Sequence, residues 1–186
     1  MDYFPTLYSP RLILRKIDID DIPALLKHGN NKKIADRIPN IPFPYEEPQA
    51  VFRISYVVQG FKQNKRFVFA IIHKESEELI GEISLHKEGE KMAQVAFWLG
   101  EAYWNQGITT EALEAVLKFG LEKANFDQIY ATCRPDNEAS AKVLAKNGMK
   151  QGADQGNQRR TVSSFCSRPS ASTKTYVYER LDKKAK

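Results

Sequence analysis

The sequence has few cysteines, few histidines and no long apolar run, and each shortage excludes a class of protein. Its 186 residues include two cysteines and three histidines, and their spacing fits neither a disulfide framework nor a structural metal site. No apolar run approaches the ~18 residues that cross a bilayer, and no signal peptide is visible. We therefore expect a protein of the cytoplasm that holds no metal and does not act at a membrane.

Charge of one sign is not in large excess either. The net charge is +5, with 42% hydrophobic and 27% charged residues, a balance typical of globular domains. A small positive charge suits an anionic cofactor or a ribosomal substrate but is too weak to indicate DNA binding. The length predicts one domain, over residues 1–181, followed by a charged tail over 182–186. The sequence leaves monomer and homodimer open.

What the sequence does contain is a strand-like segment, a polar turn and an amphipathic helix in direct succession. The strand covers residues 92–99, the turn 103–107, and apolar residues then recur at three and four positions. The first N–H groups of a helix lack intrahelical acceptors and lie at its positive end, so such a unit can bind pyrophosphate. Gly107 would permit close approach of a phosphate. An ordinary strand-to-helix connection is the alternative.

The residues of the turn carry a family resemblance. Residues 103–112 read Tyr-Trp-Asn-Gln-Gly-Ile-Thr-Thr-Glu-Ala, which resembles the acetyl-CoA loop of the GCN5-related N-acetyltransferase (GNAT) family, Gln/Arg-x-x-Gly-x-Gly/Ala. It is most similar to the branch that acetylates the N-termini of ribosomal proteins, where Tyr-Trp-Gly-x-Gly-x-Ala-Thr-Glu-Ala is usual. Asn105 replaces a glycine, although asparagine tolerates the left-handed conformation better than most residues. Thr109 replaces the final glycine or alanine, where it would supply a hydroxyl or crowd the site.

A second motif supports the same resemblance. Asn137-x-x-Ser140 and the later Asn-Gly-Met at 147–149 resemble the Asn-x-x-Ser…Leu-x-x-x-Gly-Phe segment of that branch. Residues 11–15, Arg-Leu-Ile-Leu-Arg, match the usual opening of the family. The resemblance therefore extends over about residues 7–150.

The predicted fold is a single α/β (α+β) domain built on a mixed, mostly antiparallel sheet of six or seven strands with flanking helices. Strands at 67–73, 79–86 and 92–99 are joined by short charged turns and should form an antiparallel meander. The strand at 128–133 follows a helical crossover and should run parallel to 92–99. In the family this parallel pair splays to form the cofactor cleft.

Two helices are expected before the meander. For the first, Pro23 favours Asp20 over Asp18 as the N-cap, because the proline then falls where no intrahelical donor is lost. The second should run from about 46 to 63, with Pro48 tolerable only in its first turn.

Two stretches are harder to interpret. Residues 38–48 contain four prolines and should be irregular. The resemblance places this stretch beside the acceptor site, where Phe43 and Tyr45 would line the site, or the two rings would simply tuck inward. Residues 151–175 alternate poorly, and a last strand follows at 176–181.

The resemblance implies an enzyme that transfers an acetyl group from acetyl-CoA to a primary amine in a ternary complex. The acceptor would be a protein N-terminus or a small-molecule amine. A non-catalytic acyl-CoA-binding module of the same fold is the rival interpretation. The implied cofactor-binding residues are Phe97, Trp98, Leu99, Trp104, Asn105, Gln106, Gly107, Ile108, Thr109, Thr110, Asn137 and Ser140.

Two residues are candidates for proton transfer. The resemblance positions Ser140 to protonate the leaving thiolate and Asn137 to bind the cofactor arm, whereas helix capping alone is the alternative for both. Glu82 is the candidate general base because it interrupts an otherwise apolar strand. The alternatives are that Glu82 lies on a solvated face, and that an α-amine with a pKa near 8 loses its proton to bulk water.

Overall fold

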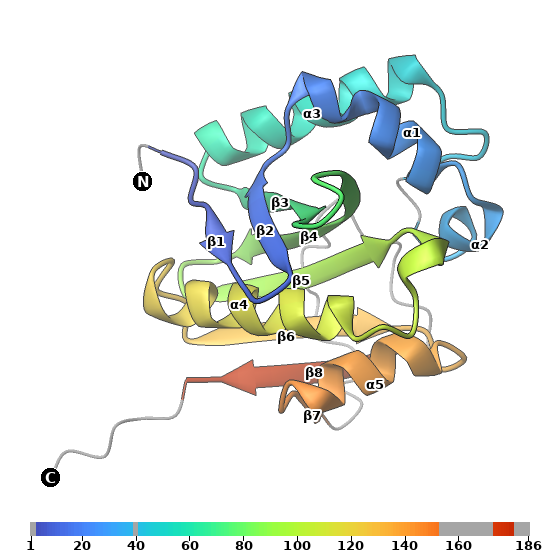
Figure 1. Cartoon of the computed structure of the whole chain (residues 1–186). Coiled ribbons are helices and arrows are strands. Elements are labelled where there is room, and N and C mark those ends of the chain that lie inside the picture. The colour runs from blue at the N-terminus through green and yellow to red at the C-terminus, as the bar shows by residue number, and fades with distance from the viewer. Residues whose placement is uncertain (1–2, 39–40, 153–172, 181–186) are drawn as a thin grey trace, which may run out of the picture.

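The computed structural model describes residues 3–38, 41–152 and 173–180, and the structural statements below concern those residues. Its centre is one sheet with the strand order β1-β2-β3-β4-β5-β6-β8-β7 (Figure 1). The strands are β1 (Leu7–Tyr8), β2 (Leu12–Lys16), β3 (Arg66–His73), β4 (Leu79–Glu88), β5 (Met92–Leu99), β6 (Gln128–Cys133), β7 (Lys150–Gln151) and β8 (Lys174–Glu179). The helices are α1 (Ile22–Gly29), α2 (Lys32–Ala35), α3 (Glu47–Lys62), α4 (Ile108–Glu122) and α5 (Glu138–Lys146), with 3-10 turns η1 (Ile19–Asp21) and η2 (Glu101–Tyr103).

The predicted mixed sheet is confirmed. Strands β3 to β5 form the expected antiparallel meander, β2 pairs antiparallel with β3, and β6 lies parallel to β5. Among the described residues, the parallel register joins only Met92, Ala93 and Gln94 of β5 to β6, although β5 continues to Leu99. The two strands therefore part toward their carboxyl ends. Two-residue edge strands, β1 and β7, bring the count within the described residues to eight, where six or seven were expected.

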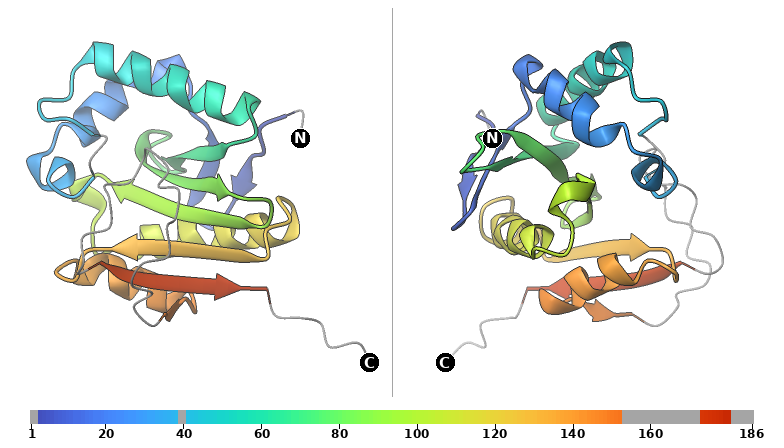
Figure 2. Two further views of the ribbon diagram at one scale, coloured as in Figure 1. Left: turned by 180° about the vertical axis from the view of Figure 1, so that it is seen from behind. Right: turned by 45° about the vertical axis from the view of Figure 1, so that its right-hand side comes forward.

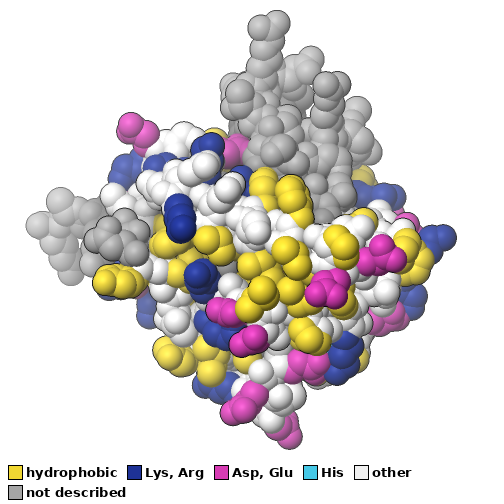
Figure 3. Space-filling model, turned by 90° about the horizontal axis from the view of Figure 1, so that it is seen from above, with side chains coloured by type: hydrophobic (Ala, Val, Ile, Leu, Met, Phe, Trp, Pro, Cys, Tyr) yellow, Lys and Arg dark blue, Asp and Glu magenta, His cyan; other side chains and the backbone are white. Residues whose placement is uncertain are grey.

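Helices cover both faces of the sheet because strand residues alternate between two cores. Ile83 and Leu85 of β4 belong to the core beneath α4, with Leu113 and Val116. The opposite face packs against α1 and α3, and its core contains Trp98. Figure 2 shows α4 and α3 on opposite sides of the sheet. Seen from above, over α1 and α3, hydrophobic side chains lie among charged ones (Figure 3).

The expected helices before the meander exist, but the first cap was predicted wrongly. Helix α3 begins at Glu47 with Pro48 in its first turn, as expected. Asp18, not Asp20, is the N-cap, and it caps the 3-10 turn η1. Its backbone is extended, and its carboxylate accepts a hydrogen bond from the N–H of Ile19. The carboxylate of Asp21 in turn accepts a hydrogen bond from the N–H of Asp18 at 2.8 Å, which completes a capping box. A 3-10 turn thus precedes α1, whereas a cap at Asp20 required the α-helix to begin at Asp21.

The stretch before α3 is partly regular. Asn31 caps the short helix α2, which the sequence did not predict, by accepting from the N–H of Lys33 at 2.8 Å. Tyr45 is buried in the core with α1 and α3, whereas Phe43 is 53% exposed. The inward-tucked alternative therefore holds for Tyr45 alone.

The last strand runs over Lys174–Glu179, close to the expected 176–181, and pairs antiparallel with β6. Most of the poorly interpretable stretch, 153–172, and the predicted tail at 182–186 lie outside the described residues. Within the described part of the chain, no helix has the length and apolarity to cross a bilayer. The same residues contain no cluster of three or more His, Cys, Asp or Glu side chains that could hold a metal ion.

Candidate active site

A cleft of about 790 Å³ opens where β5 and β6 part. Its walls are α2 and the residues after it, the end of β5, the loop before α4, the first turn of α4, the turn after β6, and α5 along its length. In Figure 1 helix α2 and the N-terminal ends of α4 and α5 all lie toward the right-hand end of the molecule, where β5 ends. All of the predicted cofactor-binding residues except Gln106 line this cleft. The structure therefore brings together two motifs that lie about 30 residues apart in the sequence.

The N-terminus of α4 is open toward the cleft. Gly107 is its N-cap residue, with φ +74° and no side-chain cap. The first backbone bond of the helix runs from the N–H of Glu111 to the carbonyl of Gly107, at 3.1 Å. No described residue accepts a hydrogen bond from the N–H groups of Ile108, Thr109 or Thr110. This is the arrangement of donors and dipole that binds phosphate.

Two left-handed residues shape the loop. Asn105 has φ +61° and Gly107 φ +74°. Asparagine therefore occupies, at the position where the family usually has glycine, a conformation that it tolerates well. A Cβ at Gly107 would meet only the Nη2 of Arg11, at 3.7 Å. Glycine is therefore favoured at this position by the positive φ, and not by close contact with other protein atoms.

Hydrogen bonds within the loop before α4 and to Arg11 hold this loop in place. The indole N–H of Trp104 donates to the carbonyl of Leu99 at 2.7 Å. The side-chain amide of Gln106 donates to the carbonyl of Ala102 at 2.9 Å, and Arg11 Nη1 donates to the carbonyl of Gln106 at 2.9 Å. Gln106 therefore braces the loop and does not line the cleft, in contrast to its predicted cofactor contact.

Glu111, in the first turn of α4, does more than complement the helix dipole. Its carboxylate accepts from the hydroxyl of Ser9 at 2.7 Å, and from the backbone N–H and Nε of Arg11 at 2.8 and 2.7 Å. Burial alone would raise the pKa of Glu111, but these hydrogen bonds outweigh it and hold the pKa below its ordinary value. No pattern in the sequence predicts this contact, which joins residues about 100 positions apart.

The N-terminus of α5 is capped. The side-chain oxygen of Asn137 accepts from the N–H of Ser140 at 3.2 Å, so the prediction that Asn137 caps this helix is confirmed. The half-buried Ser140 lines the cleft, and its hydroxyl makes no hydrogen bond to the described residues. Asn147, at the far end of α5, donates to the carbonyls of Thr110 and Val143 at 3.2 and 3.0 Å. The bond to Thr110 joins the C-terminal end of α5 to the first turn of α4.

Glu82 is not brought to the cleft. It is 3% exposed, forms a buried ion pair with Arg53, and lies outside the cleft lining. Its cross-strand neighbour on β5 is Trp98, which does line the cleft. Burial, and then the charge of Glu82, raise the pKa of Tyr45 to about 12. The solvated-face alternative for Glu82 is wrong, since the carboxylate is enclosed between β4 and α3.

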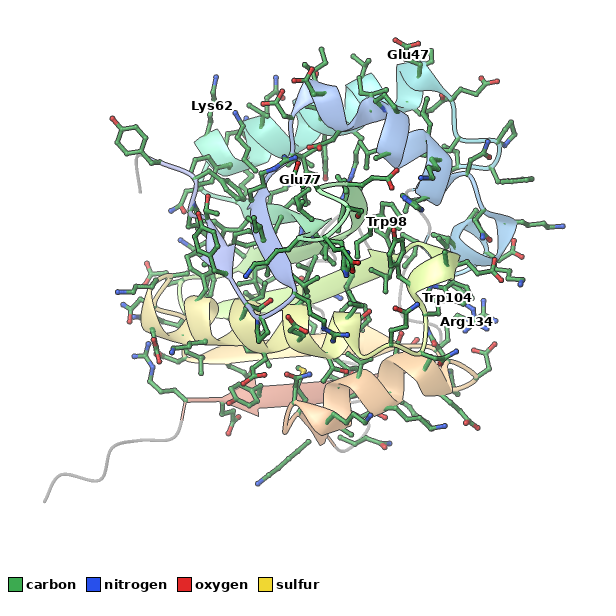
Figure 4. All side chains as sticks on the ribbon, in the orientation of Figure 1. Glu47, Lys62, Glu77, Trp98, Trp104 and Arg134 are labelled. Atoms are coloured by element: carbon green, nitrogen blue, oxygen red, sulfur yellow. The ribbon has the colours of Figure 1, made fainter. Side chains whose placement is uncertain are left out.

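Charged side chains around the cleft were missed by sequence reasoning. Arg134 and Trp104 lie at the same end of the molecule as the N-terminus of α4 (Figure 4), and Arg134 pairs with Asp136 at 3.1 Å. Arg134 lowers the pKa of Asp136, as does Arg37 across the cleft. Arg134 follows β6 directly, which is a usable signal, but Arg37 lies beside the unpredicted α2. The basic lining residues are Lys33, Arg37, Arg134, Lys142 and Lys146, and the acidic ones are Asp36, Asp136 and Glu138.

Comparisons with known proteins agree with this geometry. Residues 11–150 match the family described as the acetyltransferase (GNAT) domain. The chain is 29% identical over 144 residues to the uncharacterized N-acetyltransferase YnaD of Bacillus subtilis (strain 168), covering 77% of this chain and 81% of that protein. It is 35% identical over 80 residues to the ribosomal-protein-serine acetyltransferase of Escherichia coli (strain K12), covering 42% and 44%.

A solved structure supports the fold. RimL, described as a ribosomal L7/L12 alpha-N-protein acetyltransferase in complex with coenzyme A, matches with a TM-score of 0.76 at 18% identity, covering 94% of this chain and 98% of that one.

Proposed function

The chain belongs to the GNAT acetyltransferase family, and on this premise we propose that it transfers the acetyl group of acetyl-CoA to a primary amine. The acceptor is the α-amine of a protein N-terminus or the amine of a small molecule. The proposal of a protein N-terminus rests on the branch resemblance and on the ribosomal-protein acetyltransferases to which the chain is similar. We place the reaction in the cytoplasm as part of the same proposal.

The open N-terminus of α4 is the observation that carries this proposal. The N–H groups of Ile108, Thr109 and Thr110 need an acceptor, and no described residue supplies one. A pyrophosphate provides several acceptor oxygens and negative charge at the positive helix end. Basic residues such as Lys142 and Lys146 around the same cleft add favourable charge. The residues present therefore fit an anionic cosubstrate such as acetyl-CoA.

Ser140 is proposed as the proton donor. Acetyl-CoA supplies a thioester carbonyl carbon that a neutral amine nitrogen attacks, and the carbon–sulfur bond breaks as the amide forms. The Ser140 hydroxyl, uncommitted to any described residue and lining the cleft, donates its proton to the departing thiolate, and water returns to it the proton that the attacking nitrogen loses as the amide forms. Backbone N–H groups near Phe97 and Trp98, where the strands part, are proposed to stabilise the developing oxyanion.

The amine must also lose a proton. We assign this loss to bulk water, because an α-amine has a pKa near 8 and is partly neutral at physiological pH. A base role for Glu82 remains a prediction, and it requires two changes in the structure. The Arg53–Glu82 pair would have to open, and a water molecule would have to connect the carboxylate to the cleft.

Calorimetry with acetyl-CoA, followed by a thiol-release assay over a panel of N-terminal peptides and small amines, tests the proposal. Micromolar binding together with amine-dependent thiol release would support it. Binding without thiol release for any amine would favour the rival, a non-catalytic acyl-CoA-binding module. Absence of binding would overturn both. Thiol release without any amine sets the background, since a thioester also hydrolyses slowly.

A further inference from the structure

The turn between β1 and β2 lies against the back of the loop that precedes α4. Arg11 reaches two places there: its Nε binds Glu111 Oε2 at 2.7 Å, and its Nη1 binds the carbonyl of Gln106 at 2.9 Å. The Arg11 side chain is 44% exposed, whereas that of Glu111 is 14% exposed. Nothing in the sequence motifs required this contact, and neither side chain lines the cleft.

The bond to Gln106 determines how one peptide unit faces. Gln106 lies between the two left-handed residues of the loop, and its carbonyl points to Arg11. In a planar trans peptide the N–H lies opposite the carbonyl. The N–H of Gly107 therefore points away from Arg11, and no described residue accepts from it. Holding this carbonyl aligns one more donor ahead of the N–H groups of Ile108, Thr109 and Thr110.

The bond to Glu111 controls charge at the same place. A carboxylate in the first turn of α4 lies at the helix end that the pyrophosphate would use, and like charges at such range repel. Arg11 compensates this carboxylate, and Ser9 and the backbone N–H of Arg11 hold it on the side away from the cleft. Without the guanidinium, an uncompensated negative charge would remain near the phosphates.

We infer that Arg11 and Glu111 form a positioning pair that orients the phosphate-binding loop and sets the affinity for acetyl-CoA without touching it. The inference rests on the proposed function. It predicts that the pair acts on the phosphate end of the cosubstrate alone, because the contacts are to the loop and not to the end of β5.

Arg11→Met tests it, with Arg15→Met as the matched control. Arg15 lies four residues further along the chain, on β2, and makes a bidentate ion pair with Asp21, at 2.8 Å for both bonds, instead of a bond to the loop. Calorimetry should give an acetyl-CoA dissociation constant raised about tenfold in Arg11→Met, as a lost charge-assisted hydrogen bond implies. The value should be unchanged in Arg15→Met. With acetyl-pantetheine, which has no phosphate, kcat/KM should be unchanged in both variants.

Two further variants separate orientation from charge. Arg11→Lys keeps the positive charge but loses the planar guanidinium that binds two acceptors at once. Its acetyl-CoA dissociation constant should lie between those of wild type and Arg11→Met. Glu111→Gln alone should weaken binding less than Arg11→Met, and adding it to Arg11→Met should recover part of the loss, because the uncompensated carboxylate is removed.

The outcomes are distinguishable. Unchanged acetyl-CoA affinity in Arg11→Met, equal losses in Arg11→Met and Arg15→Met, or an equal loss with acetyl-pantetheine would each overturn the inference while wild-type binding still supports the proposed function. If Arg11→Met does not fold, Arg11→Lys and Glu111→Gln decide by the same comparison. A wild-type protein that binds no acetyl-CoA would overturn the proposed function and the inference with it.

Discussion

Two helices begin at the same cleft, and their N-termini differ. Helix α4 starts after the left-handed Gly107, with no side-chain cap, and leaves its first donors free of described partners. Helix α5 starts at Asn137, whose side chain accepts from the N–H of Ser140. One helix end therefore has donors to offer to a ligand, and the other has already satisfied one of its own.

The difference assigns distinct tasks to the two ends. An anion gains most at α4, where backbone donors and the helix dipole are unshared. At α5 the cap uses the backbone of Ser140 and leaves its hydroxyl uncommitted, so that end offers a side chain rather than a charge. We expect phosphate binding at α4 and proton transfer at α5.

The two ends are also supported differently. The loop before α4 is held by the distant β1–β2 turn through Arg11 and Glu111. The turn before α5 is held locally, by the exposed Arg134–Asp136 pair. Asn147 links both helices through the carbonyl of Thr110, so a change at one end is not fully isolated from the other.

The largest expected effect follows from adding a charge to the open end. Gly107→Glu puts a carboxylate beside the free donors of α4, and should weaken acetyl-CoA binding by about 100-fold or more. Gly148→Glu is the matched control, since Gly148 also has a positive φ, +75°, but follows α5. Both variants should lose stability through backbone strain, about 1–2 kcal/mol each, and calorimetry should separate them. Tight binding by Gly107→Glu would remove the phosphate assignment from α4.

The next effect concerns the uncommitted hydroxyl at the capped end. Ser140→Ala keeps the backbone N–H that Asn137 binds, so melting temperature and acetyl-CoA affinity should change little. Turnover should fall on the order of 100-fold if thiolate departure limits the rate. Steady-state kinetics and calorimetry on the same preparation make the measurement. Full turnover in Ser140→Ala would leave α5 with a structural role only.

Removing the cap itself should have a smaller effect. Asn137→Ala should cost about 1 kcal/mol of unfolding free energy, because the N–H of Ser140 loses its acceptor. Asn137→Asp keeps a cap of equal quality and should retain stability, yet the new charge in the cleft should raise the acetyl-CoA dissociation constant several-fold. Thermal unfolding and calorimetry on both variants test this. Equal acetyl-CoA affinity in Asn137→Asp and wild type would show that Asn137 is remote from the bound cosubstrate.

The strands, the loop before α4 and the cap of α5 could be predicted because their signals are local, and the family resemblance supplied the other cleft residues. The bounds of β5 and β6 match the expected 92–99 and 128–133, since each strand is an apolar run between turn residues. The cap at Asn137 was readable for the same reason, because the side chain bonds a backbone group three residues away.

The rest depends on contacts between distant segments. Whether Glu82 faces water, the cleft or a partner is decided by Arg53, which comes from α3. Alternation places Glu82 on a face of the sheet but does not tell what covers that face. The bracing of the loop by Arg11 likewise requires the β1–β2 turn to reach α4, which no spacing in the sequence encodes.

The smallest expected effect is a pH dependence that separates the two supports. The folded-state pKa of Glu111 lies below its ordinary value, so its ionised form stabilises the fold above about pH 4.5, and that contribution is lost as the pH falls through the folded pKa. Glu111→Gln should therefore be slightly less stable than wild type at pH 7, and the two melting temperatures should converge as the pH falls through the folded-state pKa and the wild-type carboxyl becomes protonated. Asp136, whose pKa the bond from Arg134 lowers, is fully exposed, and Asp136→Asn should change the pH profile less because solvent screens that pair. Thermal unfolding of the three proteins between pH 7 and pH 3 makes the comparison. A Glu111→Gln profile parallel to that of wild type would mean that the long-range support contributes no stability through its charge, leaving the orientation of the loop as its only effect.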